Sequence, residues 1–326
     1  MAARQAAPDA GRLIIVAGPT ASGKSALALR LAQHLNGAVI NADAMQCYRD
    51  LRILTARPSA GDEARAPHRL YGVLPASAIG NAAWWRDAAL GAMREAAREG
   101  QISILCGGTG LYLRALLHGI ADIPEPSPQA RAEARALLAQ LGAAGLHARL
   151  AEADPATASR LHPADSQRVA RAYEVWRATG RGLTEWQARP VNPLTGWSAR
   201  MLLLDPPRPA LRAAIAARFA RMLEAGALAE LRALLDRNPN PNLPLLRALG
   251  VAELAAHLRG ECTEAEAAAR AVAATCRYAR RQGTWFRHQK LVDSPAMQII
   301  SAQPDDFQQF SESLIGNYCN LINQPG

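Results

Sequence analysis

Short apolar runs alternate with amphipathic segments through the first third of the chain. Apolar runs occupy 12–17, 38–40 and 102–106, and each of them ends at a turn that contains Gly, Asn or Asp. Apolar residues at helical spacing follow at 25–35 and 109–119. This alternation predicts an α/β fold in which helices cover both faces of a parallel sheet. In such a sheet, ligands bind beyond the carboxyl ends of the strands.

The pattern changes at the proline-rich break 123–128, after which Ala, Arg and Leu fill helical stretches until an apolar run at 201–205. A helix introduced by prolines is predicted to reach about Gly226, and a last long helix to cover about 263–286. We therefore divide the chain into a first part of the core (12–122), an inserted α-helical subdomain (123–198), a second part of the core with basic C-terminal helices (199–295) and a tail to which the pattern assigns no element (296–326).

The composition fits a globular, helix-rich chain rather than a disordered or fibrous one. Of its 326 residues, 49% are hydrophobic and only 5% aromatic, and the length suffices for about two domains. No apolar run approaches the roughly 18 residues of a membrane span, and the first run is too short for a signal peptide. We therefore expect a cytoplasmic protein with no membrane partner. The five cysteines show no spacing typical of a zinc site or a disulfide framework.

Arginine dominates the charge of the chain. The formal net charge is +9, and only Lys24 and Lys290 among the 37 basic residues are lysines. Such a surface favours a polyanionic partner, although a bias toward Arg and Ala is also typical of some genomes. Between 269 and 290 there are six basic residues and no acidic one. This stretch is predicted to bind a nucleic-acid backbone.

Residues 18–25 match the phosphate-loop pattern G-x-x-x-x-G-K-[ST], directly after a predicted strand and before a predicted helix. Backbone N–H groups of such a loop point toward one centre, the lysine neutralises phosphate, and the serine hydroxyl is a ligand for Mg²⁺. We therefore predict a P-loop-type core that binds a diphosphate or nucleotide, with Ser25 as the metal ligand. The residues of this site are Gly18, Pro19, Thr20, Ala21, Ser22, Gly23, Lys24 and Ser25.

The loop alone does not identify the molecule that carries the phosphate. Kinases and hydrolytic NTPases usually place an acidic residue at the end of a second apolar strand, whereas 102–106 ends in Gly107-Gly108. Asp43 and Asp205 are the remaining acidic candidates at strand ends.

Five further blocks, taken together with the loop, resemble the bacterial tRNA dimethylallyltransferases. The resemblance covers about 12–290 and agrees in order and spacing. It implies transfer of a dimethylallyl group from dimethylallyl diphosphate to N6 of adenosine 37 in the tRNA anticodon loop, with release of diphosphate and with Mg²⁺ as cofactor. The blocks are 41–59, 66–73, 107–119, 165–175 and 278–287.

The implied chemistry assigns roles to three residues. An exocyclic adenine amine is a weak nucleophile, so a carboxylate that takes its proton assists the attack. Asp43 is our candidate for this base, although an Asp after a strand is also a common turn cap. Thr109 is the second catalytic candidate, and its ordinary role would be an N-cap. Arg218 resembles a family arginine near the diphosphate.

The resemblance also assigns tRNA contacts, whereas any single exposed arginine is also ordinary on a solvated helix face. At position 44 the family commonly has Ser where this chain has Ala44, and 248–253 lacks a Gly-Tyr-basic pattern that many members show. The implied contacts are Asp43, Ala44, Met45, Gln46, Thr109, Arg131, Gln167, Arg168, Val169, Ala170, Arg171, Arg247, Gly250, Arg280, Arg281, Gln282, Trp285 and Arg287.

Three alternatives stay open from the sequence. The loop alone fits an ATP-dependent small-molecule kinase. Adenylate isopentenyltransferases share the loop chemistry but have no use for a helical insertion or a basic C-terminal helix. A non-enzymatic RNA-binding module explains the charge and leaves the loop without a purpose. In each case we expect a monomer.

Overall fold

The computed structural model describes residues 11–188, 192–301 and 316, which belong to two compact units. One unit contains the chain up to Leu116 and from Thr195 onward, and the other contains Leu117–Leu194. The second unit starts and ends a few residues earlier than the predicted insertion at 123–198. No helix among the described residues is long and apolar enough to cross a membrane.

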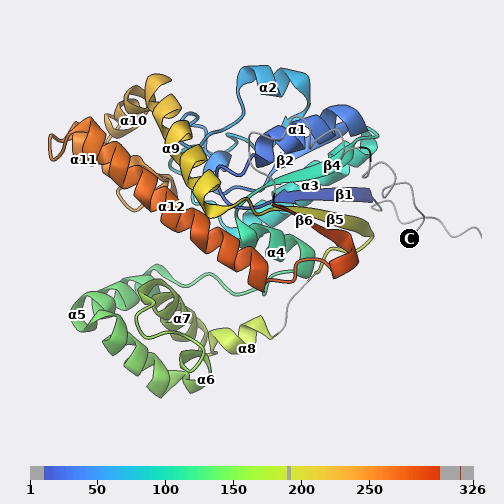
Figure 1. Cartoon of the computed structure of the whole chain (residues 1–326). Helices are drawn as coiled ribbons and strands as arrows, with labels where there is room; N and C mark the ends of the chain where they lie inside the picture. Colours follow the sequence, from blue (N-terminus) through green and yellow to red (C-terminus); the bar gives the residue numbers. More distant parts are fainter. Residues whose placement is uncertain (1–10, 189–191, 302–315, 317–326) are drawn as a thin grey trace, which may run out of the picture. The chain divides into compact units, whose positions relative to one another are not determined.

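A six-stranded parallel sheet forms the centre of the first unit, in the order β3-β2-β4-β1-β5-β6 (Figure 1). The predicted parallel α/β architecture is thereby confirmed. The two edge strands were not predicted. Strand β3 has only two residues, and β6 has four and lies in 296–326, to which the pattern assigned no element. The strands are β1 (Gly11–Ala17), β2 (Gly37–Asn41), β3 (His68–Arg69), β4 (Ile102–Gly107), β5 (Trp197–Leu204) and β6 (Met297–Ile300).

Alternating side chains of the central strands bury both faces of the sheet. Ile14 and Val16 of β1 pack with Leu27 and Leu31 of α1 on one face. Because successive strand residues point to opposite faces, the residues between them face the side where α3 and α4 lie (Figure 1). The helices of this unit are α1 (Lys24–Leu35), α2 (Ala60–Arg65), α3 (Ala82–Arg98), α4 (Gly110–His118), α9 (Arg208–Glu224), α10 (Ala227–Leu235), α11 (Val251–Leu258) and α12 (Glu264–His288).

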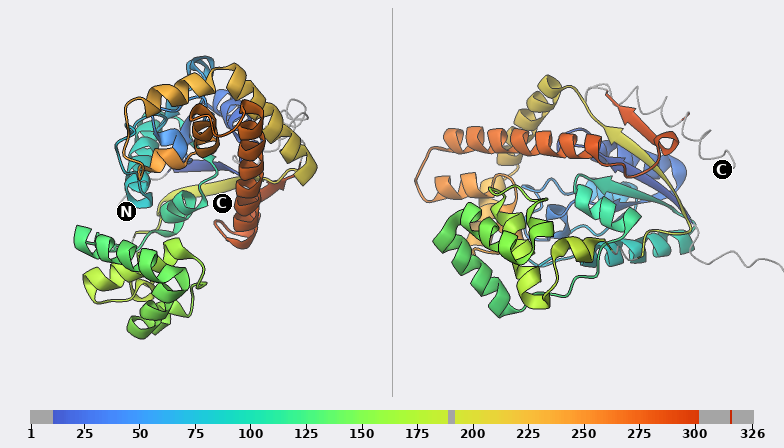
Figure 2. Two further views of the ribbon diagram at one scale, coloured as in Figure 1. Left: turned by 90° about the vertical axis from the view of Figure 1, so that its left-hand side faces the viewer. Right: turned by 90° about the horizontal axis from the view of Figure 1, so that it is seen from below.

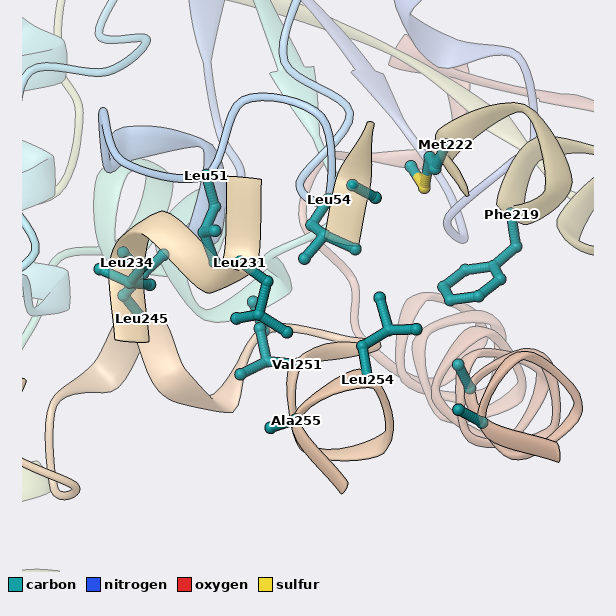
Figure 3. Packing of buried hydrophobic residues seen from close by; sticks show 14 of the residues in the cluster. Leu51, Leu54, Phe219, Met222, Leu231, Leu234, Leu245, Val251, Leu254 and Ala255 are labelled. Atoms are coloured by element: carbon teal, nitrogen blue, oxygen red, sulfur yellow. The ribbon is translucent and has the colours of Figure 1, made fainter. Parts of the chain in front are cut away.

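A second apolar cluster fixes the segment after β2 onto helices α9 to α12. Leu51 and Leu54 of this segment lie among side chains of α9, α10 and α11, as Figure 3 shows. Glu230 of α10 strengthens the attachment, because its carboxylate accepts the backbone N–H groups of Ile53 at 2.8 Å and Leu54 at 3.0 Å. The segment that follows Asp43 is therefore held firmly against these helices.

The second unit is a small helical bundle with its own core (Figure 2). Helix α5 bends at Gly142, whose φ of 68° is non-helical. Leu146, Leu150 and Val169 are fully buried between α5 and α7. The helices of this unit are α5 (Pro128–Ala153), α6 (Pro155–Ala158), α7 (Ser166–Thr179) and α8 (Leu183–Gln187).

Candidate functional site

The phosphate loop turns sharply between β1 and α1 and surrounds one side of a cavity of about 420 Å³. Gly18 has a φ of 143°, and a Cβ there would lie 2.3 Å from the Leu204 carbonyl oxygen, so only glycine fits. Gly23 has a φ of 87° and opens α1. Other elements complete the wall of the cavity, with Asp43, Gln46, Cys106, Arg218 and Arg221.

Lys24 lies in this wall, partly buried, and its Nζ donates to the Pro19 carbonyl at 2.6 Å. Burial lowers the pKa of the ammonium to about 8; negative charge at Cys106 or Asp43 acts in the opposite direction, and Arg218 lowers the pKa further. An anion bound in this cavity would stabilise the charged ammonium, because a nearby opposite charge offsets the effect of burial. The geometry therefore fits a phosphate group.

Arg218 reaches the same cavity from α9, as the resemblance implied. Its Nη2 donates to Thr20 Oγ1 at 2.6 Å, and burial lowers the pKa of the guanidinium. The loop is thus held by a cation from a helix almost two hundred residues further along the chain.

Asp43 lines the same cavity as the phosphate loop. Its backbone is fixed by Asn41, which is fully buried at the end of β2. Asn41 Oδ1 accepts the Asp43 N–H at 2.8 Å, and Asn41 Nδ2 donates to the Asp43 carbonyl at 3.0 Å. Asp43 Oδ1 accepts the Met45 N–H at 3.0 Å, so the residue is a turn cap and a cavity group at once. Asn41 is not among the predicted site residues, although a polar residue that ends an apolar strand is a signal for one.

Thr109 joins the end of β4 to the segment that contains Asp43. Its Oγ1 accepts the Ala44 N–H at 3.0 Å, so Ala44 takes part through its backbone although the family's serine hydroxyl is absent. Gly107 lies against Ala42, and a Cβ there would lie 2.1 Å from the Ala42 carbonyl. Asp43 and the phosphate loop line one cavity, and Thr109 contacts the backbone next to Asp43.

Gln46 has a fixed orientation in the wall of the cavity. Its Nε2 donates to the carbonyls of Thr55 at 2.9 Å and Ala56 at 3.0 Å, which leaves Oε1 as the acceptor of this amide. Met45 packs against the apolar cluster of Figure 3.

Comparison with known proteins identifies the family. A family model described as IPP transferase matches residues 46–289, and one described as isopentenyl transferase matches 11–75. This chain belongs to the IPP transferase family.

Relatives of this family resemble the chain over nearly its whole length. A tRNA dimethylallyltransferase of Granulibacter bethesdensis is 58% identical over 311 residues, which cover 95% of this chain and 98% of the relative. That of Acidiphilium cryptum is 58% identical over 317 residues, which cover 97% and 96%.

Two solved structures share the fold. The tRNA isopentenylpyrophosphate transferase of Bacillus halodurans has a TM-score of 0.67 at 30% identity and covers 95% of this chain and 96% of its own. A eukaryotic dimethylallyltransferase acting on tRNA has a TM-score of 0.80 at 25% identity and covers 97% of this chain and 81% of its own.

Helix α12 carries the family's last block. Arg280 and Arg281 are exposed, and Arg287 is paired with Asp205 at 3.1 Å. The Trp285 ring lies on Gly110, where a Cβ would come within 2.1 Å of it. A separate cavity of about 520 Å³ is lined by Arg208, Arg212, Arg277, Arg280 and Arg287. The assignment of RNA contacts to these arginines stays a prediction.

Gln282 differs from its neighbours on α12, because only 6% of its surface is exposed. Its amide contacts the phosphate loop and the turn before Thr109. Arg247 is exposed in the 3₁₀ turn before α11, and Gly250 opens α11 with a φ of 89°.

The predicted tRNA contacts in the helical unit are either buried in its core or lie on its surface. Val169 is fully buried, so its side chain belongs to the core of the unit. Gln167 and Arg168 are exposed, and Ala170 and Arg171 are partly exposed. The arginines form ion pairs within the unit, which are Arg131–Glu125, Arg168–Asp165 and Arg171–Glu174.

Proposed function

We propose that this chain transfers the dimethylallyl group of dimethylallyl diphosphate to N6 of adenosine 37 in tRNA and releases diphosphate. The observation that carries this proposal is a single cavity whose wall contains the phosphate loop and Asp43. Relatives of high identity are named tRNA dimethylallyltransferases, and one structural neighbour is described as acting on tRNA. We also expect it to act in the cytoplasm as a monomer.

The donor half of the cavity stabilises the leaving group. As the allylic carbon–oxygen bond breaks, negative charge grows on the diphosphate. Backbone N–H groups of the loop, the Lys24 ammonium and the Arg218 guanidinium stabilise that charge in a partly desolvated site. This arrangement acts on the transition state more than on the ground state, because the leaving oxygen carries more negative charge with the bond partly broken than in the intact ester.

The acceptor half supplies the base. Adenosine 37 has to leave its stack to reach a cavity of this kind. Its N6 lone pair attacks the allylic carbon, the carbon–oxygen bond breaks, and one N6 proton passes to the Asp43 carboxylate. Asn41 fixes the backbone of Asp43, and the Met45 N–H donates to the carboxylate and orients it.

The cavity contains a few of the oxygen ligands that a magnesium ion needs. No group of three or more His, Cys, Asp or Glu side chains that could hold a metal occurs within 11–188, 192–301 and 316. The oxygen donors in the cavity wall include the Ser25 hydroxyl and the Asp43 carboxylate, which are hard ligands of the kind that Mg²⁺ takes together with substrate phosphates. We propose that Ser25 and the diphosphate would hold Mg²⁺, which would supply charge neutralisation to the leaving group.

The test is a transfer assay. The protein is incubated with dimethylallyl diphosphate, Mg²⁺ and an undermodified tRNA with adenosines at 36 and 37. The tRNA is then digested, and the masses of its fragments are measured by mass spectrometry. We expect one dimethylallyl group on adenosine 37 and none with Asp43→Ala, which should still bind tRNA. AMP as the preferred acceptor would indicate an adenylate isopentenyltransferase, and phosphoryl transfer from ATP a kinase; either result contradicts the proposal.

A further inference from the structure

Gln282 lies on the buried stripe of α12, together with Ala271, Thr275, Ala279 and Phe286. A glutamine in such a stripe needs partners for both ends of its amide. Oε1 accepts the Thr20 N–H at 2.9 Å, and Nε2 donates to the Gly108 carbonyl at 2.8 Å. Both partners are backbone groups, and they belong to two different loops.

The two loops serve the two halves of the cavity. Thr20 belongs to the phosphate loop after β1, and Arg218 holds its hydroxyl from the other side. Gly108 belongs to the turn after β4, which continues into Thr109, whose hydroxyl holds the backbone next to Asp43. One buried amide therefore bridges the loop that holds the leaving group and the turn that places the base.

A glycine next to the bridge leaves room for the Gln282 amide. A Cβ at Gly108 would lie 2.3 Å from Gln282 Nε2, so glycine at 108 permits the amide to reach the carbonyl. Since β1 and β4 are neighbours in the sheet, their backbones fix the bases of both loops, and Gln282 fixes the loops beyond the strand ends.

We propose that Gln282 is a positioning residue that sets the separation between the diphosphate cradle and Asp43. This inference rests on the proposed function. A displacement needs the attacking nitrogen, the allylic carbon and the leaving oxygen in line, and a shift of about 1 Å can lower the rate about 100-fold. Without the bridge, the residues that bind the donor and those that bind the acceptor are still present. Loss of Gln282 therefore lowers kcat while each substrate still binds.

Two variants separate the bridge from simple packing. Gln282→Leu keeps a side chain of similar size but replaces the amide by an apolar group, and it loses both hydrogen bonds. Gln282→Glu keeps the acceptor for the Thr20 N–H, but its ionised form turns an oxygen toward the Gly108 carbonyl. The protonated carboxyl donates a hydrogen bond instead and restores both contacts. The rate of Gln282→Glu relative to the unaltered protein should therefore rise as pH falls.

Charged groups near the bridge come from several elements. They are Lys24 on α1, Asp43 after β2, Arg218 on α9, and the Asp205–Arg287 pair next to Gly283. All of them are shared by the unaltered protein and the variants. Dividing each variant's rate by that of the unaltered protein at the same pH compensates for titrations that the variants share.

The experiment measures single-turnover transfer to tRNA between pH 6 and 8.5. Dissociation constants are measured separately for tRNA and for a non-reactive thiodiphosphate analogue of the donor. Thr284→Ala, exposed on α12, is the matched control, and thermal unfolding checks that each variant folds. We expect Gln282→Leu to lose about 100-fold in rate at every pH with both dissociation constants within about threefold. Gln282→Glu should lose as much at pH 8.5 and recover most of it at pH 6.

Three results would overturn the inference. The donor analogue could bind more weakly by as much as the rate falls, which would place Gln282 in the donor half alone. Weaker tRNA binding at an unchanged rate would make it an RNA contact. A Gln282→Glu rate that does not rise, relative to the unaltered protein, as pH falls would exclude the bridge, and this comparison decides the matter even if Gln282→Leu does not fold. Absence of transfer by the unaltered protein, by contrast, contradicts the proposed function itself.

Discussion

The cations of the cavity and those of the helical unit are held in opposite ways. Lys24 and Arg218 are partly buried and donate to the loop that they serve, and burial lowers the pKa of both. Arg168 and Arg171 lie on the surface of α7 and pair with acidic side chains of their own helix cap or helix. A desolvated cation contributes more per charge and is screened less by salt than an exposed ion pair.

Helix α12 is intermediate between these extremes. Arg277, Arg280 and Arg281 are exposed, and none of the three forms an ion pair with an acidic side chain in the described part of the chain. Such arginines can bind a phosphate without first giving up a carboxylate. The three regions therefore predict a graded series of effects on substrate binding.

The largest effect is expected from the buried cation. Lys24→Met should weaken binding of the thiodiphosphate donor analogue about 10- to 100-fold, because a charge-assisted hydrogen bond is worth about 1.5–3 kcal/mol. Titration calorimetry measures it, with Lys290→Met as the control that removes the other lysine. Equal losses in the two variants would mean that Lys24 acts only through net charge.

The lowered pKa of Lys24 predicts a pH dependence. The ammonium is charged below about pH 8 and loses its proton above it, so donor affinity should fall by up to about tenfold per pH unit above 8. Measuring binding of the donor analogue from pH 7 to 10 tests this. Lys24→Arg keeps its charge throughout, and its affinity should not fall in that range. The same decline in both proteins would assign the titration to another group.

An unpaired arginine of α12 should have a smaller effect. Arg280→Ala is expected to weaken tRNA binding several-fold and to reduce the slope of log affinity against log salt by about 0.7–0.9, the value for one phosphate contact. Filter binding at several salt concentrations measures both. Arg149→Ala is the control, since Arg149 is exposed in the helical unit and paired with Glu152, and it should leave the slope unchanged.

The smallest effect is expected where the arginine is paired. Asp165→Asn should strengthen tRNA binding about two- to threefold, because it releases Arg168 from an exposed pair worth about 0.2–1 kcal/mol. Asparagine also caps a helix, so α7 should keep its N-terminus. A tRNA affinity that stays the same or falls would show that Arg168 does not contact RNA.

Burial on both faces explains why most of the sheet was predictable. The apolar runs of β1, β2 and β4 stand out because apolar residues dominate them, with the small, buried Ser103 inside β4, and binding loops follow each of them. Strands β3 and β6 are too short for a period to appear, and β6 contains Gln298. Their pairing depends on neighbours far away in the sequence, which a local pattern does not contain.

The site was predictable where a motif carries its own geometry. The phosphate loop follows from local sequence, and the resemblance selected Asp43 from two acidic candidates at strand ends, whereas the partners of Thr20 come from α9 and α12. The buried position of Gln282 was readable from its spacing to Ala279 and Phe286. In the same way, Val169 shares a helix face with Ala172 and Tyr173 and belongs to a core.

The position of residues 117–194 within the chain has a consequence for synthesis. They separate β1 and β4 from β5, although β5 pairs with β1 along its whole length. The helical unit makes its contacts among neighbouring segments, so it can fold as soon as its last helix leaves the ribosome. The sheet is completed later, because β1 can pair with β5 only after β5 has been synthesised, and the edge strand β6 follows later still. During that interval, the exposed edge of β1 is the part of the nascent chain most open to pairing with another molecule.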